Sequence, residues 1–235
     1  MSNLGQLIAK LCPNGVAYKP LGDIGTFVRG KRFVRNDIRA EGVPCIHYGE
    51  LYTHYGVSTQ ESISFLDEEV AAKLRFASTG DVIIVAAGET VEDIGIGVAW
   101  LSKEPVAVHD ACFIFKHGEC PEYVSYFLRT EFYHAQIKKY VSTGKISSIS
   151  SKGLEKACMP VPPFAVQREI VRILDNFAKL TAELTAELTA ELTARQKQYK
   201  YYRDLLLTFD DANSTISTDR QTDRQTDRQT DRQTD

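Results

Sequence analysis

Residues 181 to 192 read Thr181-Ala182-Glu183-Leu184-Thr185-Ala186-Glu187-Leu188-Thr189-Ala190-Glu191-Leu192, one four-residue unit repeated three times. The repeat lies inside a stretch from Arg168 to Leu207 that contains neither Gly nor Pro. Ala, Leu and Glu are strong helix formers, and Thr tolerates a helix. The stretch therefore predicts a helix of roughly 40 residues and about 60 Å, far longer than a compact domain usually needs.

The four-residue period gives this helix two further properties. Each unit adds roughly 6 Å and rotates the end of the helix by about 40° beyond a full turn, so one unit more or less would change both spacing and phase. The apolar positions form a stripe that needs a partner. Because the repeat steps by four residues, that stripe drifts away from a left-handed heptad seam. A generic coiled-coil segment is the simpler interpretation of the repeat. The stripe consists of Ile170, Leu174, Phe177, Leu184, Leu188 and Leu192.

A proline-rich junction precedes the helix. Pro160, Pro162 and Pro163 cannot donate to a sheet or lie inside a helix, so a strand must end here and a helix can begin only afterwards. We therefore predict an α/β (α+β) domain over residues 1–160, a long helix over residues 161–211 and a tail over residues 212–235. In the first domain we expect a strand-like segment from Lys19 to Ile24, buried strands at Val82–Ala87 and Val106–Phe115, and a helix at Tyr123–Tyr140.

The tail repeats Thr-Asp-Arg-Gln four times from Thr218 and ends with Thr234-Asp235. Alternating charge without apolar residues predicts disorder. The tetranucleotide ACAG in tandem encodes this peptide cycle in all three reading frames. We hypothesise a DNA tract prone to slippage, so that expression of the protein varies by phase. Mixed synonymous codons in the coding DNA would contradict this hypothesis.

The segments around the repeat resemble the specificity subunits of type I restriction-modification systems. The junction Pro160–Ile170 matches that family's P-x-P-P-hydrophobic-x-x-Q-x-x-I motif, and Gln198–Phe209 is similar to its Q-Y-x-Y-Y-R-D-x-L-L-x-F helix ending. Some members of the family carry Thr-Ala-Glu-Leu repeats. The resemblance implies a target recognition domain that binds double-stranded DNA and is followed by a long helix.

The resemblance also implies partners. Methyltransferase subunits would carry S-adenosylmethionine and methylate adenine N6. The resemblance is also compatible with a restriction and translocase subunit as a further partner. Tyr199 and Tyr202 are candidate contacts at the helix end, although aromatic packing between paired helices is an equal alternative. Family members usually have two recognition domains and two antiparallel helices, whereas this sequence shows one of each. We expect a homodimer joined by an antiparallel coiled coil and reading a bipartite site; a non-catalytic adaptor or an inactive truncation product is the alternative.

The composition argues against a membrane-spanning or disulfide-linked protein. No apolar run approaches the roughly 20 residues that a membrane span needs. The five cysteines show no C-x-x-C spacing, which predicts reduced and mostly buried thiols in a cytoplasmic protein. Residues 1–160 contain 17 basic and 18 acidic residues, a net charge of −1, so net charge does not indicate DNA binding.

Local clusters of charge are more informative, because each phosphate that a cation neutralises releases counterions. A solvated surface is the alternative for any one cluster. The first cluster contains Arg29, Lys31, Arg32, Arg35 and Arg39, and the second contains Lys138, Lys139, Lys145, Lys152 and Lys156. Further candidates are side chains suited to base edges and a Gly- and Ser-rich loop suited to phosphate. They are Tyr48, Tyr52, Glu89, Thr90, Thr143, Gly144, Lys145 and Ser147.

Several catalytic motifs are incomplete. Gly25–Arg32 contains the G-x-x-x-x-G-K part of a P-loop, but Arg32 replaces the hydroxyl residue that would bind Mg²⁺. Val161–Phe164 is similar to the Asn/Asp-Pro-Pro-Tyr/Phe motif of adenine methyltransferases, but Val161 cannot accept a hydrogen bond from the target amino group. The five histidines show no metal-ligand spacing. We therefore expect a non-catalytic chain with no metal site and no cofactor of its own.

Overall fold

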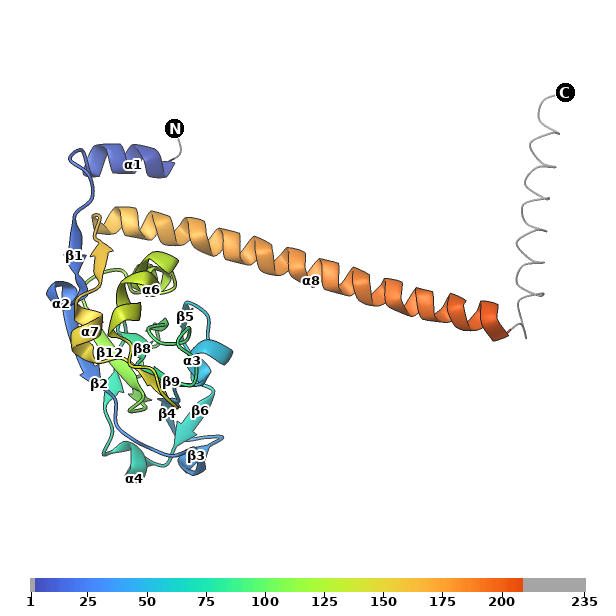
Figure 1. The fold of residues 1–235 in the computed structure, drawn as a ribbon, viewed down its shortest axis with the longest axis horizontal. Coiled ribbons are helices and arrows are strands. Elements are labelled where there is room, and N and C mark those ends of the chain that lie inside the picture. Colours follow the sequence, from blue (N-terminus) through green and yellow to red (C-terminus); the bar gives the residue numbers. More distant parts are fainter. Residues whose placement is uncertain (1–2, 209–235) are drawn as a thin grey trace. The chain divides into compact units, whose positions relative to one another are not determined.

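The computed structural model describes residues 3–208, and the structural statements below concern these residues. The chain divides into two compact units, Met1–Leu174 and a second unit that begins at Asp175 (Figure 1). The first unit is an α/β domain of short strands and short helices, and the second continues the long helix. The predicted fold class, an α/β domain followed by a long helix, is confirmed.

A five-stranded sheet forms the main core. Its strand order is β2 (Gly25–Arg29), β12 (Cys112–His117), β8 (Val82–Val85), β10 (Gly97–Trp100) and β5 (Ser58–Thr59). Neighbours are antiparallel except β10 and β5, which are parallel. Every residue of β8 and of β10 is buried, as a central strand covered on both faces requires. The predicted buried strand at Val82–Ala87 is confirmed, with β8 ending at Val85.

A second five-stranded sheet packs around its own small apolar cluster, which contains Phe33, Cys45, Leu66, Ala71 and Ala107. The strand order is β3 (Ile38–Arg39), β6 (Ser64–Leu66), β4 (Val43–Ile46), β11 (Val106–Val108) and β7 (Phe76–Ala77). β4 and β11 are parallel, and the remaining pairs are antiparallel.

The prediction of one strand at Val106–Phe115 is wrong. The chain leaves the second sheet after Val108, turns at residues 109–111 and enters the first sheet at Cys112. The Cys112 N–H donates to the His109 carbonyl at 3.0 Å, which closes this turn. An apolar run therefore supplies strands to two sheets, and the polar residues between them mark the crossing.

Two short pairings close the domain. β1 (Tyr18–Pro20) pairs antiparallel with β14 (Cys158–Pro160), and β9 (Ala87–Gly88) pairs with β13 (Ser147–Ser148). The predicted strand-like segment from Lys19 ends at Pro20, because Leu21–Ile24 forms the helical turn α2. The first pairing brings the segment before the long helix next to the segment after α1 (Asn3–Leu11).

The predicted helix at Tyr123–Tyr140 is divided into three pieces. These are α5 (Pro121–Phe127), α6 (Glu131–Ile137) and the 3-10 turn η2 (Lys138–Tyr140). Thr130 causes the division, because its Oγ1 accepts a hydrogen bond from the Tyr133 N–H at 3.2 Å and so caps a new helix. The other short helical elements of the domain are η1 (Arg35–Asp37), α3 (Glu50–Thr53), α4 (Glu68–Ala71) and α7 (Ser151–Glu155).

The long helix α8 runs from Phe164 to Thr208 and has 45 residues. Its first turns belong to the domain: Val166, Gln167 and Val171 are buried, and Ile170 and Leu174 are half-buried. The domain's packing therefore extends to Leu174, beyond the proline junction at which the predicted domains were divided. The rest of the predicted stripe is exposed, namely Phe177, Leu184, Leu188 and Leu192, as are Tyr199 and Tyr202.

The Thr residues of the repeat, and Thr193 directly after it, each use their hydroxyl group as a donor within the helix. Thr181, Thr185, Thr189 and Thr193 each donate to the carbonyl four residues earlier, at 2.7 to 2.8 Å. These bonds leave no Thr hydroxyl donor without a partner if a second protein covers the helix. Residues 209–211 and the predicted disordered tail, residues 212–235, lie outside the described residues.

The five cysteines are free thiols, and all except Cys158 are buried. This agrees with the prediction of reduced, mostly buried thiols. Between residues 3 and 208, no helix is both long enough and apolar enough to cross a membrane.

Candidate nucleic-acid interface

Four cations of the first basic cluster lie on residues 29–35, a segment that continues from the last residue of β2 and is attached to the end of β11, while Arg39 lies in β3. The Lys31 N–H donates to the Val108 carbonyl at 3.0 Å, and the Gly30 N–H donates to the Cys112 carbonyl at 2.9 Å. Gly30 is required by this close approach, because a Cβ there would lie 2.1 Å from the His109 carbonyl oxygen. The segment is therefore fixed by its backbone, and its long side chains extend from a defined position.

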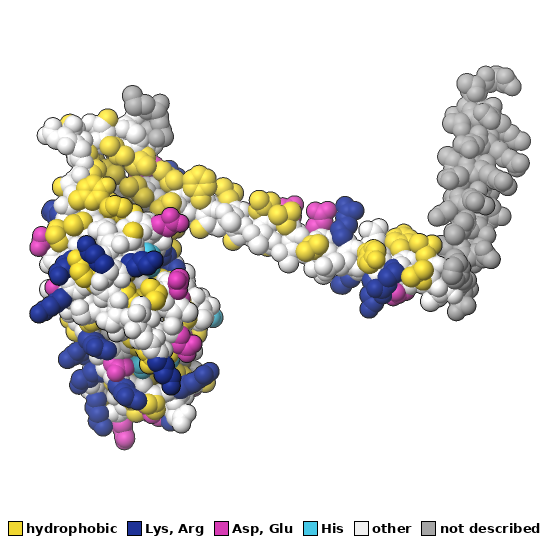
Figure 2. Space-filling model, viewed as in Figure 1, with side chains coloured by type: hydrophobic (Ala, Val, Ile, Leu, Met, Phe, Trp, Pro, Cys, Tyr) yellow, Lys and Arg dark blue, Asp and Glu magenta, His cyan; other side chains and the backbone are white. Residues whose placement is uncertain are grey.

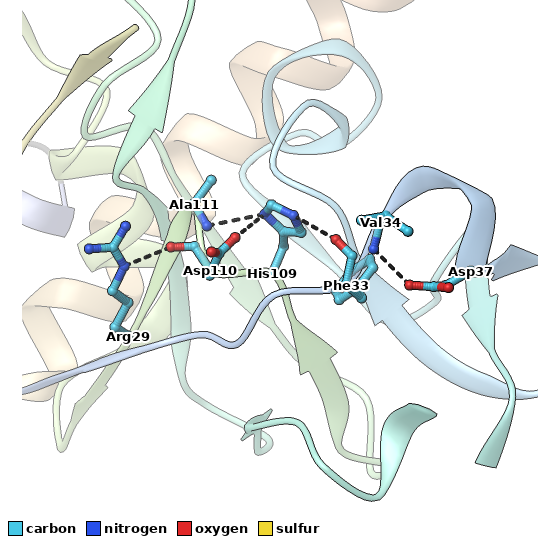
Figure 3. Close-up of polar contacts among 7 residues, drawn as sticks. All are labelled: Arg29, Phe33, Val34, Asp37, His109, Asp110 and Ala111. Atoms are coloured by element: carbon cyan, nitrogen blue, oxygen red, sulfur yellow. Dashed lines mark hydrogen bonds and ion pairs between the residues drawn. The ribbon is translucent and has the colours of Figure 1, made fainter. Parts of the chain in front are cut away.

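His109 fixes the next part of the segment (Figure 3). Its Nδ1 accepts the Ala111 N–H at 3.1 Å, so the ring proton lies on Nε2, which donates to the Phe33 carbonyl at 3.1 Å. The buried Phe33 ring meets the imidazole edge to face, with centroids 4.9 Å apart. Asp37 Oδ2 accepts the Val34 N–H at 2.8 Å and closes the turn that follows.

His47 lies beside His109, although the two residues are far apart in the sequence. β4 and β11 are parallel with Ile46 opposite Val108, so the residue after each strand reaches the same edge of the sheet. The two imidazole centroids are 4.7 Å apart, and the Tyr48 ring lies 4.5 Å from His47. The two histidines are 62 positions apart, and no motif in the sequence connects them. Only the parallel pairing of β4 with β11 brings them together.

Burial keeps both imidazoles neutral near pH 7. It lowers the pKa of His47 to about 4, assisted by His109 and the positive charge of Arg35. Burial also lowers the pKa of His109, although Asp110 Oδ1, 3.2 Å from Nδ1, opposes this effect. Neutral rings can donate and accept hydrogen bonds at the same time, which suits the arrangement around His109.

We expect the protein to lose stability as pH falls from about 6.5 to about 4. His47 in the unfolded chain has an ordinary pKa near 6.5, whereas the folded state disfavours its protonation. The stability that the neutral ring contributes is complete above pH 6.5 and disappears as pH passes through the folded value. Urea unfolding at pH 7.5, 5.5 and 4.5 should show a smaller pH dependence for His47→Gln than for the unchanged chain. Identical pH dependence in the two proteins would contradict the assignment to His47.

The predicted cations of the first cluster separate into two groups. Arg29 Nε donates to the Asp110 carbonyl at 2.8 Å, and Lys31 Nζ donates to the Lys73 carbonyl at 2.8 Å. Arg39 pairs with Asp67 at 3.1 Å. Among the contacts of the described residues, the guanidinium groups of Arg32 and Arg35 form no hydrogen bond or ion pair with the protein, and both side chains are exposed. These two guanidinium groups are available to a ligand.

The predicted loop candidates also meet in space. Ser147 pairs with Gly88 in the β9–β13 ladder, so the loop that precedes Ser147 begins next to the segment that follows Gly88. Thr143, Gly144, Lys145 and Glu89 are exposed, and exposed Thr90 donates through Oγ1 to Asp93 Oδ2. Ser147 is only 3% exposed, so its side chain supports the loop and does not face solvent.

The two predicted tyrosines belong to the turn after β4 and to α3. Tyr48 and Tyr52 are half-buried and pack against the main core. Burial raises the pKa of Tyr52, and the negative charges of Asp93 and Glu89 raise it further. The charges of residues 89 and 93 therefore act on Tyr52.

The second basic cluster is partly held by an aromatic ring. Lys139 Nζ and Lys156 Nζ lie 5.1 Å and 4.9 Å from the centroid of Tyr140.

Figure 2 shows Lys and Arg side chains gathered at the end of the domain that carries β3 and α4, and hydrophobic side chains gathered near α1 and the start of α8. The described residues contain no group of three or more His, Cys, Asp or Glu side chains arranged to hold a metal ion.

Comparison with known proteins decides the family. The family model described as "Type I restriction modification DNA specificity domain" matches residues 13–194. The chain belongs to this family. The resemblance predicted from the sequence is therefore confirmed, and the matched range covers both the specificity domain and most of the repeat helix.

Individual relatives agree with this membership of the specificity-domain family. A putative type I restriction enzyme specificity subunit of Haemophilus influenzae is 49% identical over 191 residues, which cover 80% of this chain and 47% of the relative. The EcoR124I/EcoR124II specificity subunit of Escherichia coli is 50% identical over 66 residues, covering 28% of this chain and 16% of that protein. The chain spans about half the length of the Haemophilus influenzae relative.

Solved structures show the same fold. A chain from a structural study of assembly and conformational transition in a type I restriction-modification system has a TM-score of 0.58 and 18% identity, covering 83% of this chain and 48% of that one. The HsdS subunit of Thermoanaerobacter tengcongensis has a TM-score of 0.51 and 17% identity, covering 77% and 44%. At this identity the likeness concerns the fold alone.

Proposed function

We propose that this specificity-domain protein reads one half of a bipartite DNA site and recruits N6-adenine methyltransferase subunits, without being catalytic itself. The observation that carries the proposal is the fixed basic segment: residues 29–35 are attached to the strand ends, while the guanidinium groups of Arg32 and Arg35 have no hydrogen-bonding partner among the described residues. Preorganised cations beside exposed loops suit phosphate and base contacts. S-adenosylmethionine would be bound by the methyltransferase subunit.

The exposed face of α8 supports the proposal of a homodimer. Leu184, Leu188 and Leu192 are 57% to 58% exposed, and covering one such side chain would contribute about 1.5 to 3 kcal/mol. Burial of the neighbouring Thr side chains costs less free energy than burial of unpaired hydroxyl groups, because their hydroxyl groups already donate within the helix. A second copy of the helix, running antiparallel, would cover the stripe and place two recognition domains around a two-fold axis.

Single-molecule methylation sequencing tests the function. DNA from cells that express this chain with its cognate methyltransferase subunit would be compared with DNA from cells that lack the chain. We expect a new N6-methyladenine motif composed of inverted halves around a fixed gap. An asymmetric motif would indicate that a different half-site reader takes part. Absence of any new motif, with both proteins expressed, would favour an adaptor or an inactive truncation product.

Deletion of one Thr-Ala-Glu-Leu unit, residues 189–192, should change the preferred gap and leave the bases of each half unchanged. The deletion shortens the helix by about 6 Å and changes its phase by about 40°. The methylation motifs of the two proteins provide the measurement. Replacement of the same unit by Ala-Ala-Glu-Leu is the control, since it keeps length and phase. A changed base preference with an unchanged gap would contradict the role of the helix as a spacer.

A further inference from the structure

A pocket of about 300 Å³ opens beside the carboxyl end of β4. Its walls come from the turn that follows the strand and from η1, and include Arg35, His47, Tyr48, Gly49, Glu50 and Thr53. The pocket therefore combines a guanidinium, a carboxyl group, a neutral imidazole and an aromatic ring. Residues that carry hydrogen-bond donors and acceptors therefore line one small volume at the proposed interface.

The carboxyl group of Glu50 is held in place at the pocket. Its Oε2 accepts the backbone N–H of His47 at 3.0 Å, and its Oε1 accepts the Ser64 hydroxyl at 2.5 Å. A carboxylate oxygen has more than one acceptor site, so both oxygens keep the capacity to accept another hydrogen bond. Glu50 thus lines the pocket with an acceptor group whose position the fold has already determined, and burial raises the pKa of this carboxyl group.

Arg35 is attached to a fixed backbone but has a free head group. The segment before it is held by the Phe33 carbonyl on His109, and the turn after it is closed by Asp37 on the Val34 N–H. The guanidinium is exposed and forms no hydrogen bond or ion pair with the described protein groups, yet its charge acts on His47. It can therefore meet a ligand in the pocket without breaking an existing contact.

The Glu50 carboxyl group indicates whether the pocket would bind a DNA phosphate or the edge of a base pair. A phosphate presents only acceptors and a negative charge, so Glu50 would repel it. A base pair presents both kinds of group in the major groove: guanine offers O6 and N7 as acceptors, and cytosine offers the N4 amino group as a donor. Arginine matches guanine, and a carboxylate matches the cytosine N4 donor. The mixed chemistry of this pocket therefore favours a base pair over a phosphate.

We propose that the Arg35 pocket reads a guanine–cytosine pair, with Arg35 donating to guanine O6 and N7 and Glu50 accepting from cytosine N4. This inference rests on the proposed DNA-recognition function. It makes Arg35 a specificity-determining residue and not one of several equivalent phosphate contacts. Arg32, which is also exposed and has no carboxylate partner among the described residues, is then the matched phosphate-type cation.

The test compares Arg35→Gln with Arg32→Gln in the full-length chain. Each protein would be titrated with duplexes that carry every single base-pair substitution of the methylated motif, at several salt concentrations. Arg35→Gln should lose roughly 10- to 100-fold discrimination at one guanine–cytosine position and keep the others. Arg32→Gln should weaken binding to all duplexes alike and lower the slope of log affinity against log salt by about 0.9. Thermal unfolding would verify that both variants remain folded.

Three results would overturn the proposal for Arg35. The first is uniform weakening by Arg35→Gln with a reduced salt slope, which would make Arg35 a phosphate contact. The second is unchanged discrimination at every position, and the third is relaxed discrimination at an adenine–thymine position. Failure of the unchanged protein to prefer any sequence, alone and with its methyltransferase subunit, would contradict the proposed function itself and is distinguishable from all three.

Discussion

Replacing Gln167 by Ala should lower the free energy of unfolding by about 3 kcal/mol. Gln167 is completely buried, and its amide forms three hydrogen bonds at the start of α8. Its Oε1 accepts the Cys120 N–H at 3.0 Å, and its Nε2 donates to the Pro162 carbonyl at 2.8 Å and to Glu119 Oε2 at 2.6 Å. Alanine leaves all three partners without this bond, and an unsatisfied buried polar group costs about 1 to 3 kcal/mol.

Urea unfolding followed by the fluorescence of the buried Trp100 would measure this loss, because Trp100 is the only tryptophan of the chain. Gln196→Ala is the control. Gln196 is exposed on the same helix, so its replacement should change stability by less than about 0.5 kcal/mol. Gln167→Glu should be nearly as harmful as Gln167→Ala at pH 7, since an oxygen replaces the donor that faces Glu119. Equal stability of Gln167→Ala and Gln196→Ala would refute the role assigned to Gln167.

Gly30→Ala should be at least as damaging, with a loss of about 3 kcal/mol or more and a large loss of DNA affinity. A Cβ at residue 30 would lie 2.1 Å from the His109 carbonyl oxygen and 2.4 Å from the Val108 carbonyl oxygen. Both contacts are with backbone, which cannot rotate away as a flexible side chain can. The basic segment must therefore leave the strand end, and the positions of Arg32 and Arg35 are lost with it.

Gly118→Ala is the matched control for Gly30→Ala, because a Cβ at residue 118 meets no atom within 4 Å. Thermal unfolding and DNA titration of the two variants distinguish the effect of the steric clash at residue 30 from a general effect of replacing a glycine. We expect Gly118→Ala to resemble the unchanged protein in both measurements. A Gly30→Ala protein that kept its stability and its affinity would show that the close approach at residue 30 is not needed.

The junction motif illustrates how far sequence reasoning extends. Pro160, Pro162 and Pro163 correctly predicted the change from strand to helix, since proline limits both structures locally. The adjacent Gln167 could be recognised as part of a family motif, but its role could not. That role depends on Cys120 and Glu119, which are 47 and 48 residues distant in the chain.

For the candidate site, too, the sequence indicates which residues are candidates, and the fold determines what each side chain contacts. Clusters of charge made Arg32 and Arg35 candidates, because the abundance of a residue type is visible in sequence. The sequence did not show that Arg29, Lys31 and Arg39 bind protein groups, or that Ser147 is buried. Those outcomes depend on which carbonyls and carboxylates the fold brings near each side chain.

The sequence by itself determined the long helix, its period and its start after the prolines; the observed helix begins at Phe164, and the predicted range began at residue 161. Helix formation follows from neighbours three and four residues apart, so propensity and spacing are sufficient. Only the tertiary structure decided the turn of the chain between two sheets at residues 109–111, the parallel pairing of β4 with β11 and the meeting of His47 with His109. Pairing between strands depends on register across long sequence separations, and local preferences do not specify which distant strand will be the partner.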